Sequence, residues 1–131
     1  MSKKVVLDTN VIVSAIYTPN GNPANVLKQL FDDEIKLHYN KDILKEYEDV
    51  LSRPYLKLDK SKKSRFFEIL NQTGIMVNAP ASIFSMTDES DRKFYDTAKA
   101  CDAIIITGNK KHYPDEPFIL TPAEFLNKHK N

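Results

Sequence analysis

The sequence predicts an α/β fold in which a mostly parallel sheet is covered by helices on both faces. Short runs rich in Val and Ile alternate along the chain with longer amphipathic stretches, which is the order expected of strands and helices in βαβ units. The chain of 131 residues has no internal repeat, low-complexity tract or linker. We therefore expect a single domain over residues 1–131, with a sheet of four or five strands.

The first expected strand, residues 5–8, ends on a carboxylate. Its sequence, VVLD, is followed by Thr9 and Asn10, and aspartate and asparagine are poor strand residues. An apolar helical pattern then continues to about Tyr17. Asp8 is therefore either the N-cap of this helix or a metal ligand or general base at the edge of the sheet, and the residue alone favours neither.

The later elements are expected from periodicity and from capping signals. They are a helix over residues 22–33, a strand over 35–39, a helix over 40–53, a helix over 60–72, a strand over 75–78, a helix over 90–101, strands over 103–107 and 118–120, and a last helix from 121. Asn22 and Asn40 are expected to cap helices, Gly74 to stop one, and Thr121 with Glu124 to form a capping box.

Asp91 lies in an unusual place for a carboxylate. At 100° per residue it falls within the apolar stripe of its helix, which is formed by Phe94, Tyr95, Ala98 and Cys101. A carboxylate on a buried face is unfavourable unless it is paired, capped or bound to a metal.

The other acidic residues are less informative. We expect Asp96 to lie on the opposite, solvated face, where Arg92 and Lys99 can pair with it, and Asp88 to cap the helix. Glu46 and Glu48 lie on opposite edges of an apolar stripe, so periodicity alone cannot select between them.

The composition narrows the possible functions. The net charge of +1 gives no overall basic surface for nucleic acid, so such contacts would need local patches. One basic run, Lys57 to Arg65, is expected to be a solvated helix face.

Cys101 is the only cysteine, which excludes an intrachain disulfide and a thiolate zinc site and favours a reducing, cytoplasmic setting. No segment is apolar enough over sufficient length to span a membrane, so we expect no membrane partner.

Four segments in order carry a family resemblance. They are VVLDTNVIVSA, ILKEYEDVLSRP, DRKFYDTAKACDA and IIITGNKKHYP. Together they resemble the PIN-domain family of metal-dependent ribonucleases, many of which are VapC-like toxin halves of toxin–antitoxin pairs. The last segment resembles a subgroup with the pattern TGN-x-KH-x-P. The resemblance covers essentially the whole chain and implies a Rossmann-like three-layer α/β/α fold with strand order 3-2-1-4-5.

The resemblance also implies a site. It makes Asp8, Glu46 and Asp91 the catalytic carboxylates that hold Mg²⁺ or Mn²⁺, and so selects Glu46 over Glu48. It makes Asn10 a supporting hydrogen-bonder and gives Asn109 the fourth-motif position. Thr107 and Ser14 are further supporting candidates, with ordinary packing as the open alternative. Lys110, Lys111 and His112 follow Asn109 and are possible phosphate contacts at the mouth of the crevice, with local capping or packing as the open alternative for His112. Many relatives carry aspartate where this chain has Asn109, which leaves three formal negative charges instead of four. The implied partners are RNA, an antitoxin protein and a second copy of the chain in a homodimer.

There are three alternatives to this interpretation. A receiver domain needs a phosphoacceptor aspartate after the third strand, where this chain has Asn78. A phosphatase of the haloacid-dehalogenase type needs two aspartates in its first motif, and the sequence DTN supplies one. The alternative that stays open is a catalytically weakened PIN-like module that binds RNA or a protein partner without cleaving.

Overall fold

A computed structural model describes residues 2–82, 86 and 89–129, and it confirms the expected fold class. Five strands form one sheet in the order β3-β2-β1-β4-β5, and each neighbouring pair is parallel. The strands are β1 Lys3–Leu7, β2 Ile35–Tyr39, β3 Ile75–Met76, β4 Ile104–Ile106 and β5 Ile119–Leu120. This is the strand order 3-2-1-4-5 implied by the family resemblance.

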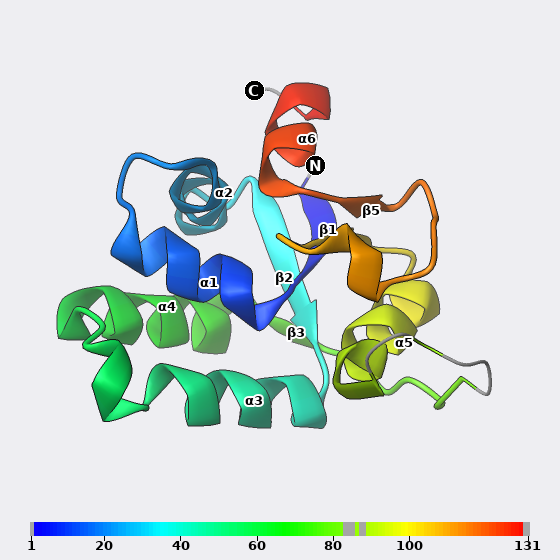
Figure 1. Ribbon diagram of the computed structural model, residues 1–131, viewed down its shortest axis with the longest axis horizontal. Helices are drawn as coiled ribbons and strands as arrows, with labels where there is room; N and C mark the ends of the chain where they lie inside the picture. The colour runs from blue at the N-terminus through cyan, green and yellow to red at the C-terminus, as the bar shows by residue number, and fades with distance from the viewer. Residues whose placement is uncertain (1, 83–85, 87–88, 130–131) are drawn as a thin grey trace.

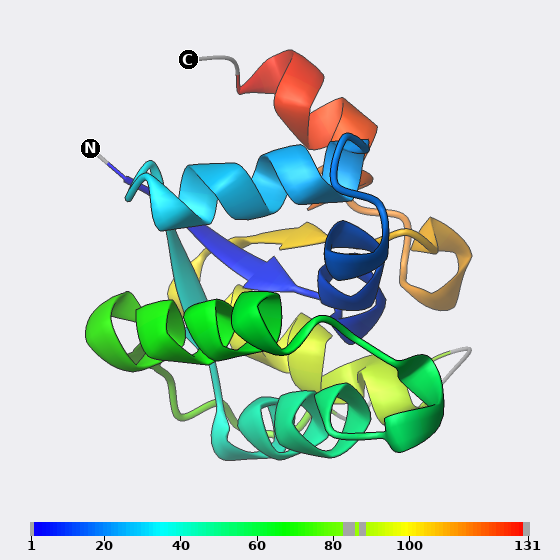
Figure 2. The same cartoon turned by 90° about the vertical axis from the view of Figure 1, so that its left-hand side faces the viewer.

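The helices form a layer on each side of the sheet. They are α1 Thr9–Tyr17, α2 Asn22–Phe31, α3 Lys41–Leu51, α4 Lys60–Thr73, α5 Arg92–Cys101 and α6 Pro122–Lys128, with short 3₁₀ turns η1 Pro54–Leu56, η2 Glu89–Asp91 and η3 Lys110–His112. In Figures 1 and 2, α1, α2 and α4 lie on one side of the central strands and α5 lies on the other. Strands β1 and β2 point towards α3, which lies at the lower end of the sheet in Figure 1.

The central strands are apolar because both of their faces are covered. Val5, Val6 and Leu7 of β1 are fully buried, as are Ile105 and Ile106 of β4. Parallel sheets with helices on both faces typically have such continuous runs of β-branched residues rather than an alternating pattern.

The register of the sheet determines which residues leave it together. Leu7 of β1 lies opposite Ile106 of β4, and the Asp8 amide donates to the Ile106 carbonyl at 3.0 Å. Asp8 and Thr107, the next residue on each strand, therefore emerge side by side at the carboxyl edge of the sheet. In open α/β sheets this edge is where ligands bind.

Several expected boundaries differ from the structure. Asn22 is the first residue of α2, and Gly21 occupies the N-cap position without a side-chain hydrogen bond. Strand β3 covers two residues instead of four; it is an edge strand, and Ile75 and Met76 are 44% and 48% exposed. The expected cap residue Asp88 lies outside the described residues. The capping box of α6, by contrast, is confirmed at Thr121 and Glu124.

The expectation for Asp96 was wrong. Its side chain is buried, with 8% of the residue exposed, and one oxygen accepts a hydrogen bond from the Ser82 amide at 3.1 Å. Arg92 donates to the Ser82 carbonyl at 3.1 Å. The chain before α5 therefore folds back over the face that helical periodicity alone assigns to solvent.

Within the described part of the chain, none of the helices combines the length and the apolar character needed to cross a membrane.

Candidate metal centre

Asp8 links the first strand to the first helix and is held by three donors. It is the N-cap of α1, and its Oδ1 accepts from the Asn10 amide at 3.3 Å. Its Oδ2 accepts from the Thr107 hydroxyl at 2.9 Å and from the Tyr113 hydroxyl at 3.2 Å. Only 6% of Asp8 is exposed. The N-cap interpretation is therefore correct, but the Oδ2 contacts come from residues about a hundred positions away, which capping does not require.

Glu46 approaches Asp8 from α3. One of its oxygens accepts a hydrogen bond from the Thr9 hydroxyl, and the other forms an ion pair with Lys93 Nζ at 2.8 Å. Glu48 is exposed and lines a separate pocket between α3 and α4. The structure therefore places Glu46, and not Glu48, beside Asp8.

Asp91 approaches from the other side of the sheet. It is the last residue of η2, directly before α5, and is 9% exposed. Its Oδ2 lies 3.1 Å from His112 Nδ1, and the other ring nitrogen of His112 lies 2.9 Å from the Asn109 side-chain nitrogen. His112 therefore bridges the Asp91 carboxylate and the Asn109 side chain through its two ring nitrogens.

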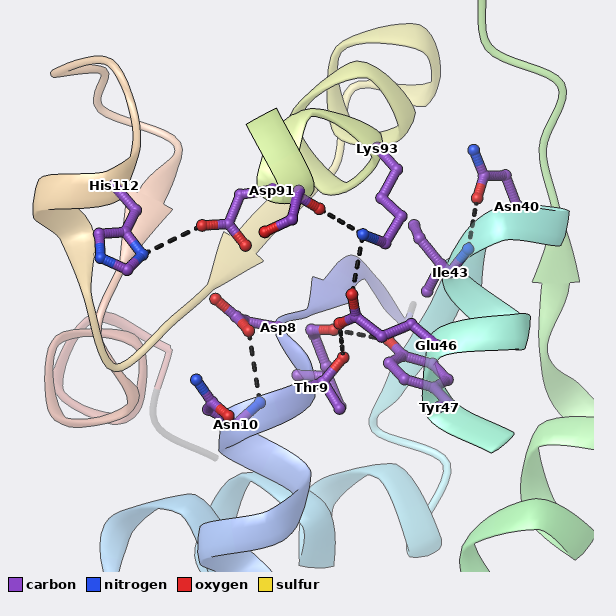
Figure 3. Close-up of polar contacts among 12 residues, drawn as sticks. Asp8, Thr9, Asn10, Asn40, Ile43, Glu46, Tyr47, Asp91, Lys93 and His112 are labelled. Atoms are coloured by element: carbon purple, nitrogen blue, oxygen red, sulfur yellow. Dashed lines mark hydrogen bonds and ion pairs between the residues drawn. The ribbon is translucent and has the colours of Figure 1, made fainter. Parts of the chain in front are cut away.

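The three carboxylates lie in one region of the molecule. Figure 3 shows the side chains of Asp8 and Asp91 near each other, with His112 beside Asp91, and it shows the Glu46 carboxylate turned to Lys93 and Thr9. Asp8 stands on the strand edge, Glu46 on α3 and Asp91 at the start of α5, so three separate elements supply the acids.

The negative charge around Asp8 helps to raise the pKa of two buried tyrosines, Tyr47 and Tyr113. Burial raises the pKa of Tyr47 well above its usual value, and the charges of Asp8 and Glu46 raise it further. Burial also raises the pKa of Tyr113, followed by the charges of Asp8 and Asp91. Both hydroxyls therefore stay protonated donors; Tyr47 donates to the Leu7 carbonyl at 2.5 Å and Tyr113 to Asp8.

A divalent cation fits part of this arrangement. In the described part of the chain, no three His, Cys, Asp or Glu side chains are arranged so that one ion could contact them all. Mg²⁺, however, is often held by only one or two carboxylates and several waters. The hard oxygen donors Asp8 and Asp91 suit such an ion, whereas Glu46 is already neutralised by Lys93.

Of the supporting residues expected from the sequence and described by the structure, Thr107 and Asn10 contact Asp8 and Ser14 does not. Thr107 is fully buried, donates to Asp8 and accepts from the Asn109 amide at 3.0 Å, so it organises both residues. Asn10 contacts Asp8 through its backbone amide. Ser14 is exposed on α1, and among the described residues no hydrogen bond joins it to the three carboxylates.

The expected phosphate contacts also differ in their surroundings. Lys110 pairs with Glu124 of the α6 capping box at 3.1 Å, which draws it away from the carboxylates. Lys111 is exposed on η3, and His112 contacts Asp91.

Sequence reasoning missed Lys93, Tyr113 and Thr9. Lys93 and Tyr113 lie inside the quoted motifs but look like ordinary helix and loop residues. Their roles depend on contacts with residues more than 40 positions away, which one sequence does not reveal.

The sequence profile of the PIN domain matches residues 4–111. This chain belongs to the PIN-domain family. Members of the family are generally nucleases that use divalent metal ions.

Two individual proteins are similar to this PIN domain. The chain is 36% identical over 110 residues to the uncharacterized protein MJ1680 of Methanocaldococcus jannaschii, covering 82% of this chain and 71% of the relative. The fold of this chain is similar to that of a chain in the crystal structure of VapBC2 from Rickettsia felis, which is bound to a DNA fragment from the VapBC2 promoter. That match has a TM-score of 0.56 and 19% identity, and it covers 90% of this chain and 96% of that chain.

Proposed function

We propose that this PIN domain is a divalent-metal-dependent endoribonuclease that hydrolyses RNA phosphodiester bonds. The observation that supports the proposal is the position of Asp8 and Asp91 at the carboxyl edge of the sheet, with Glu46 nearby on a third element. Acids gathered in this way repel one another, and a cation relieves that repulsion. A bound Mg²⁺ or Mn²⁺ would activate a water and neutralise charge on the phosphate.

The residues of the chain take distinct roles in this proposal. Asp8 and Asp91 hold the ion, and Thr107 and Tyr113 fix the orientation of Asp8 through its Oδ2. Lys111, exposed on η3 beside His112, is the better placed cation for phosphate, because Lys110 is paired with Glu124.

The decisive test is cleavage of single-stranded RNA with Mn²⁺, compared with an excess of chelator. Asp8→Asn should abolish cleavage, because it removes a ligand charge. Asparagine is as good an N-cap as aspartate, so the fold should persist. Glu48→Gln, which removes an exposed acid from the helix that carries Glu46, is the matched control and should cleave normally. Cleavage that survives both Asp8→Asn and the chelator would reject the mechanism.

A catalytically weakened module that binds RNA or a protein without cleaving is the second candidate. The observation that favours it is Asn109, whose uncharged amide contacts His112 instead of contributing a fourth carboxylate. RNA binding by gel shift with no cleavage at any Mn²⁺ concentration would support this candidate over the nuclease.

We also propose that the chain is the toxin half of a cytoplasmic toxin–antitoxin pair and acts as a homodimer. Support comes from the similarity in fold to a chain of the VapBC2 complex. Light scattering of the purified chain, and co-purification with the product of any small neighbouring gene, test this proposal. A monomer at high concentration and a neighbourhood without such a gene would count against it.

A further inference from the structure

Lys93 places a positive charge inside the acidic crevice. It lies on α5, two residues after Asp91, and only 18% of its side chain is exposed. Its ammonium is 2.8 Å from Glu46 Oε1, donates to the Ser90 carbonyl and lies 5.1 Å from the centroid of the Phe94 ring. Figure 3 shows this ammonium beside Glu46, on the side of the crevice formed by α5.

This position has an electrostatic consequence. A lysine that is largely withdrawn from water is unfavourable unless a carboxylate and further acceptors compensate it, and Lys93 has both. Its charge compensates that of Glu46, so Asp8 and Asp91 are the two crevice acids outside this ion pair.

A second metal ion would need ligands that this crevice does not offer in the described part of the chain. Glu46 is engaged by Lys93 and by the Thr9 hydroxyl. Asn109 is uncharged, and its amide contacts His112. No group of three acidic or other metal-binding side chains surrounds a common point in the described residues.

We propose that Lys93 is an internal cation that takes the place of a second metal ion on the Glu46 side of the crevice. The inference rests on the proposed metal site of Asp8 and Asp91. It makes this PIN domain a one-ion site whose remaining positive charge is supplied by the chain itself. Glu46 and Lys93 also line an open pocket of about 580 Å³ between α3 and the start of α5, so a cation can reach Glu46 once Lys93 is removed.

The test is the number of Mn²⁺ ions bound by the full chain, measured by calorimetry and by electron paramagnetic resonance of the free ion. The natural protein should bind one ion. Lys93→Met should bind two, because it frees the Glu46 carboxylate. Lys93→Arg should bind one, because it keeps the charge. Lys99→Met, which removes an exposed lysine of the same helix, is the matched control and should also bind one.

A charge-neutral double variant guards against a folding defect. Glu46→Gln combined with Lys93→Met removes both members of the ion pair and leaves no unpaired buried charge. It should bind a single ion with an affinity within about threefold of the natural protein, since neither removed group contacts that ion. A loss of more than about tenfold would show that Glu46 holds the ion directly, and would overturn the inference.

The remaining outcomes are equally decisive. Two ions in the natural protein, one ion in folded Lys93→Met, or no ion in either would each overturn the inference. RNA cleavage is measured separately, so the two proposals fail independently. A protein that binds ions as expected but does not cleave would refute the nuclease and leave the role of Lys93 standing. A protein that cleaves RNA but binds two ions would support the nuclease and overturn the role of Lys93.

Discussion

At the scale of single residues, the two oxygens of Asp8 are held in different ways. Oδ1 accepts from the backbone of its own helix, and Oδ2 accepts from Thr107 and Tyr113, which follow the neighbouring strand β4. The first contact is a capping bond available to any N-cap aspartate. The second pair fixes the plane of the carboxylate, which a helix cap does not require.

Tyr113→Phe should destabilise the protein by about 1–3 kcal/mol, because it removes a hydrogen bond to a buried carboxylate while preserving the ring. Urea denaturation measures this change in the free energy of unfolding. Tyr55→Phe is the control, since Tyr55 is 71% exposed, and it should change the free energy by less than about 0.5 kcal/mol. An equal effect of the two substitutions would show that the Tyr113 hydroxyl does not support Asp8.

Asn109→Asp should tighten Mn²⁺ binding by about 1–3 kcal/mol, because it restores a carboxylate where the chain has a neutral amide. Calorimetry of Mn²⁺ binding to both proteins measures the difference. Asn127→Asp adds the same charge at an exposed position on α6 and should leave the affinity unchanged. Equal affinities for the natural protein and Asn109→Asp would show that Asn109 does not limit metal binding.

At the scale of elements, the site depends on helices whose starts are set locally. Asn40 caps α3, and its side chain accepts from the Ile43 amide at 2.8 Å. Glu46 lies on the second turn of this helix, so the cap helps to fix where the helix that carries it begins.

Asn40→Ala should destabilise the protein by about 1 kcal/mol, because alanine cannot cap the exposed amides of the first turn. Asn40→Asp should retain most of the stability, since aspartate caps equally well. Thermal denaturation compares these variants with Asn71→Ala, which replaces an exposed asparagine inside α4 and should be neutral or slightly stabilising. A neutral effect of Asn40→Ala would contradict a capping role.

Most elements fixed by local signals were predicted from the sequence, with the α2 cap expected at Asn22 instead of Gly21 as the exception, and those fixed by distant contacts were not. The Asn40 cap and the Thr121 capping box involve residues three positions apart, and both are confirmed. The burial of Asp96 depends on Ser82, fourteen residues earlier, and periodicity placed it wrongly in solvent. The short β3 reflects its place at the edge of the sheet, which the pattern of apolar residues does not encode.

The residues of the candidate site also divide into those marked by a local sequence pattern and those that depend on distant contacts. The strand-end position of Asp8 and the stripe position of Asp91 marked both residues in the sequence. Glu46 could be separated from Glu48 only through the family resemblance. The role of Lys93 needed the contact between α5 and α3, which brings residues 47 positions apart in the chain into an ion pair.

At the scale of the whole molecule, buried tyrosines make the fold sensitive to alkaline pH. Burial raises the pKa of Tyr47 well above its usual value of 10, with the charges of Asp8 and Glu46 adding to the effect. Burial and a hydrogen bond to Glu116 raise the pKa of Tyr95 to about 12. The two rings lie on different helices, α3 and α5, in the layers around the sheet.

The sign of the effect follows from proton linkage. Below pH 10 these phenols are protonated in both the folded and the unfolded chain, and their contribution to stability is fully present. Above pH 10 the unfolded chain releases protons that the folded chain retains, so stability falls as the pH rises. For Tyr95 the fall continues until the pH passes its folded pKa of about 12.

Urea denaturation at a series of pH values above 10 should therefore show a falling free energy of unfolding, by up to about 1.4 kcal/mol per pH unit for each such tyrosine. Tyr95→Phe lowers the overall stability by removing the bond to Glu116, but it should also make this fall less steep, because one phenol no longer ionises on unfolding. The slope, rather than the stability itself, separates ionisation from lost packing. A Tyr95→Phe protein with the slope of the natural chain would show that Tyr95 does not couple folding to alkaline pH.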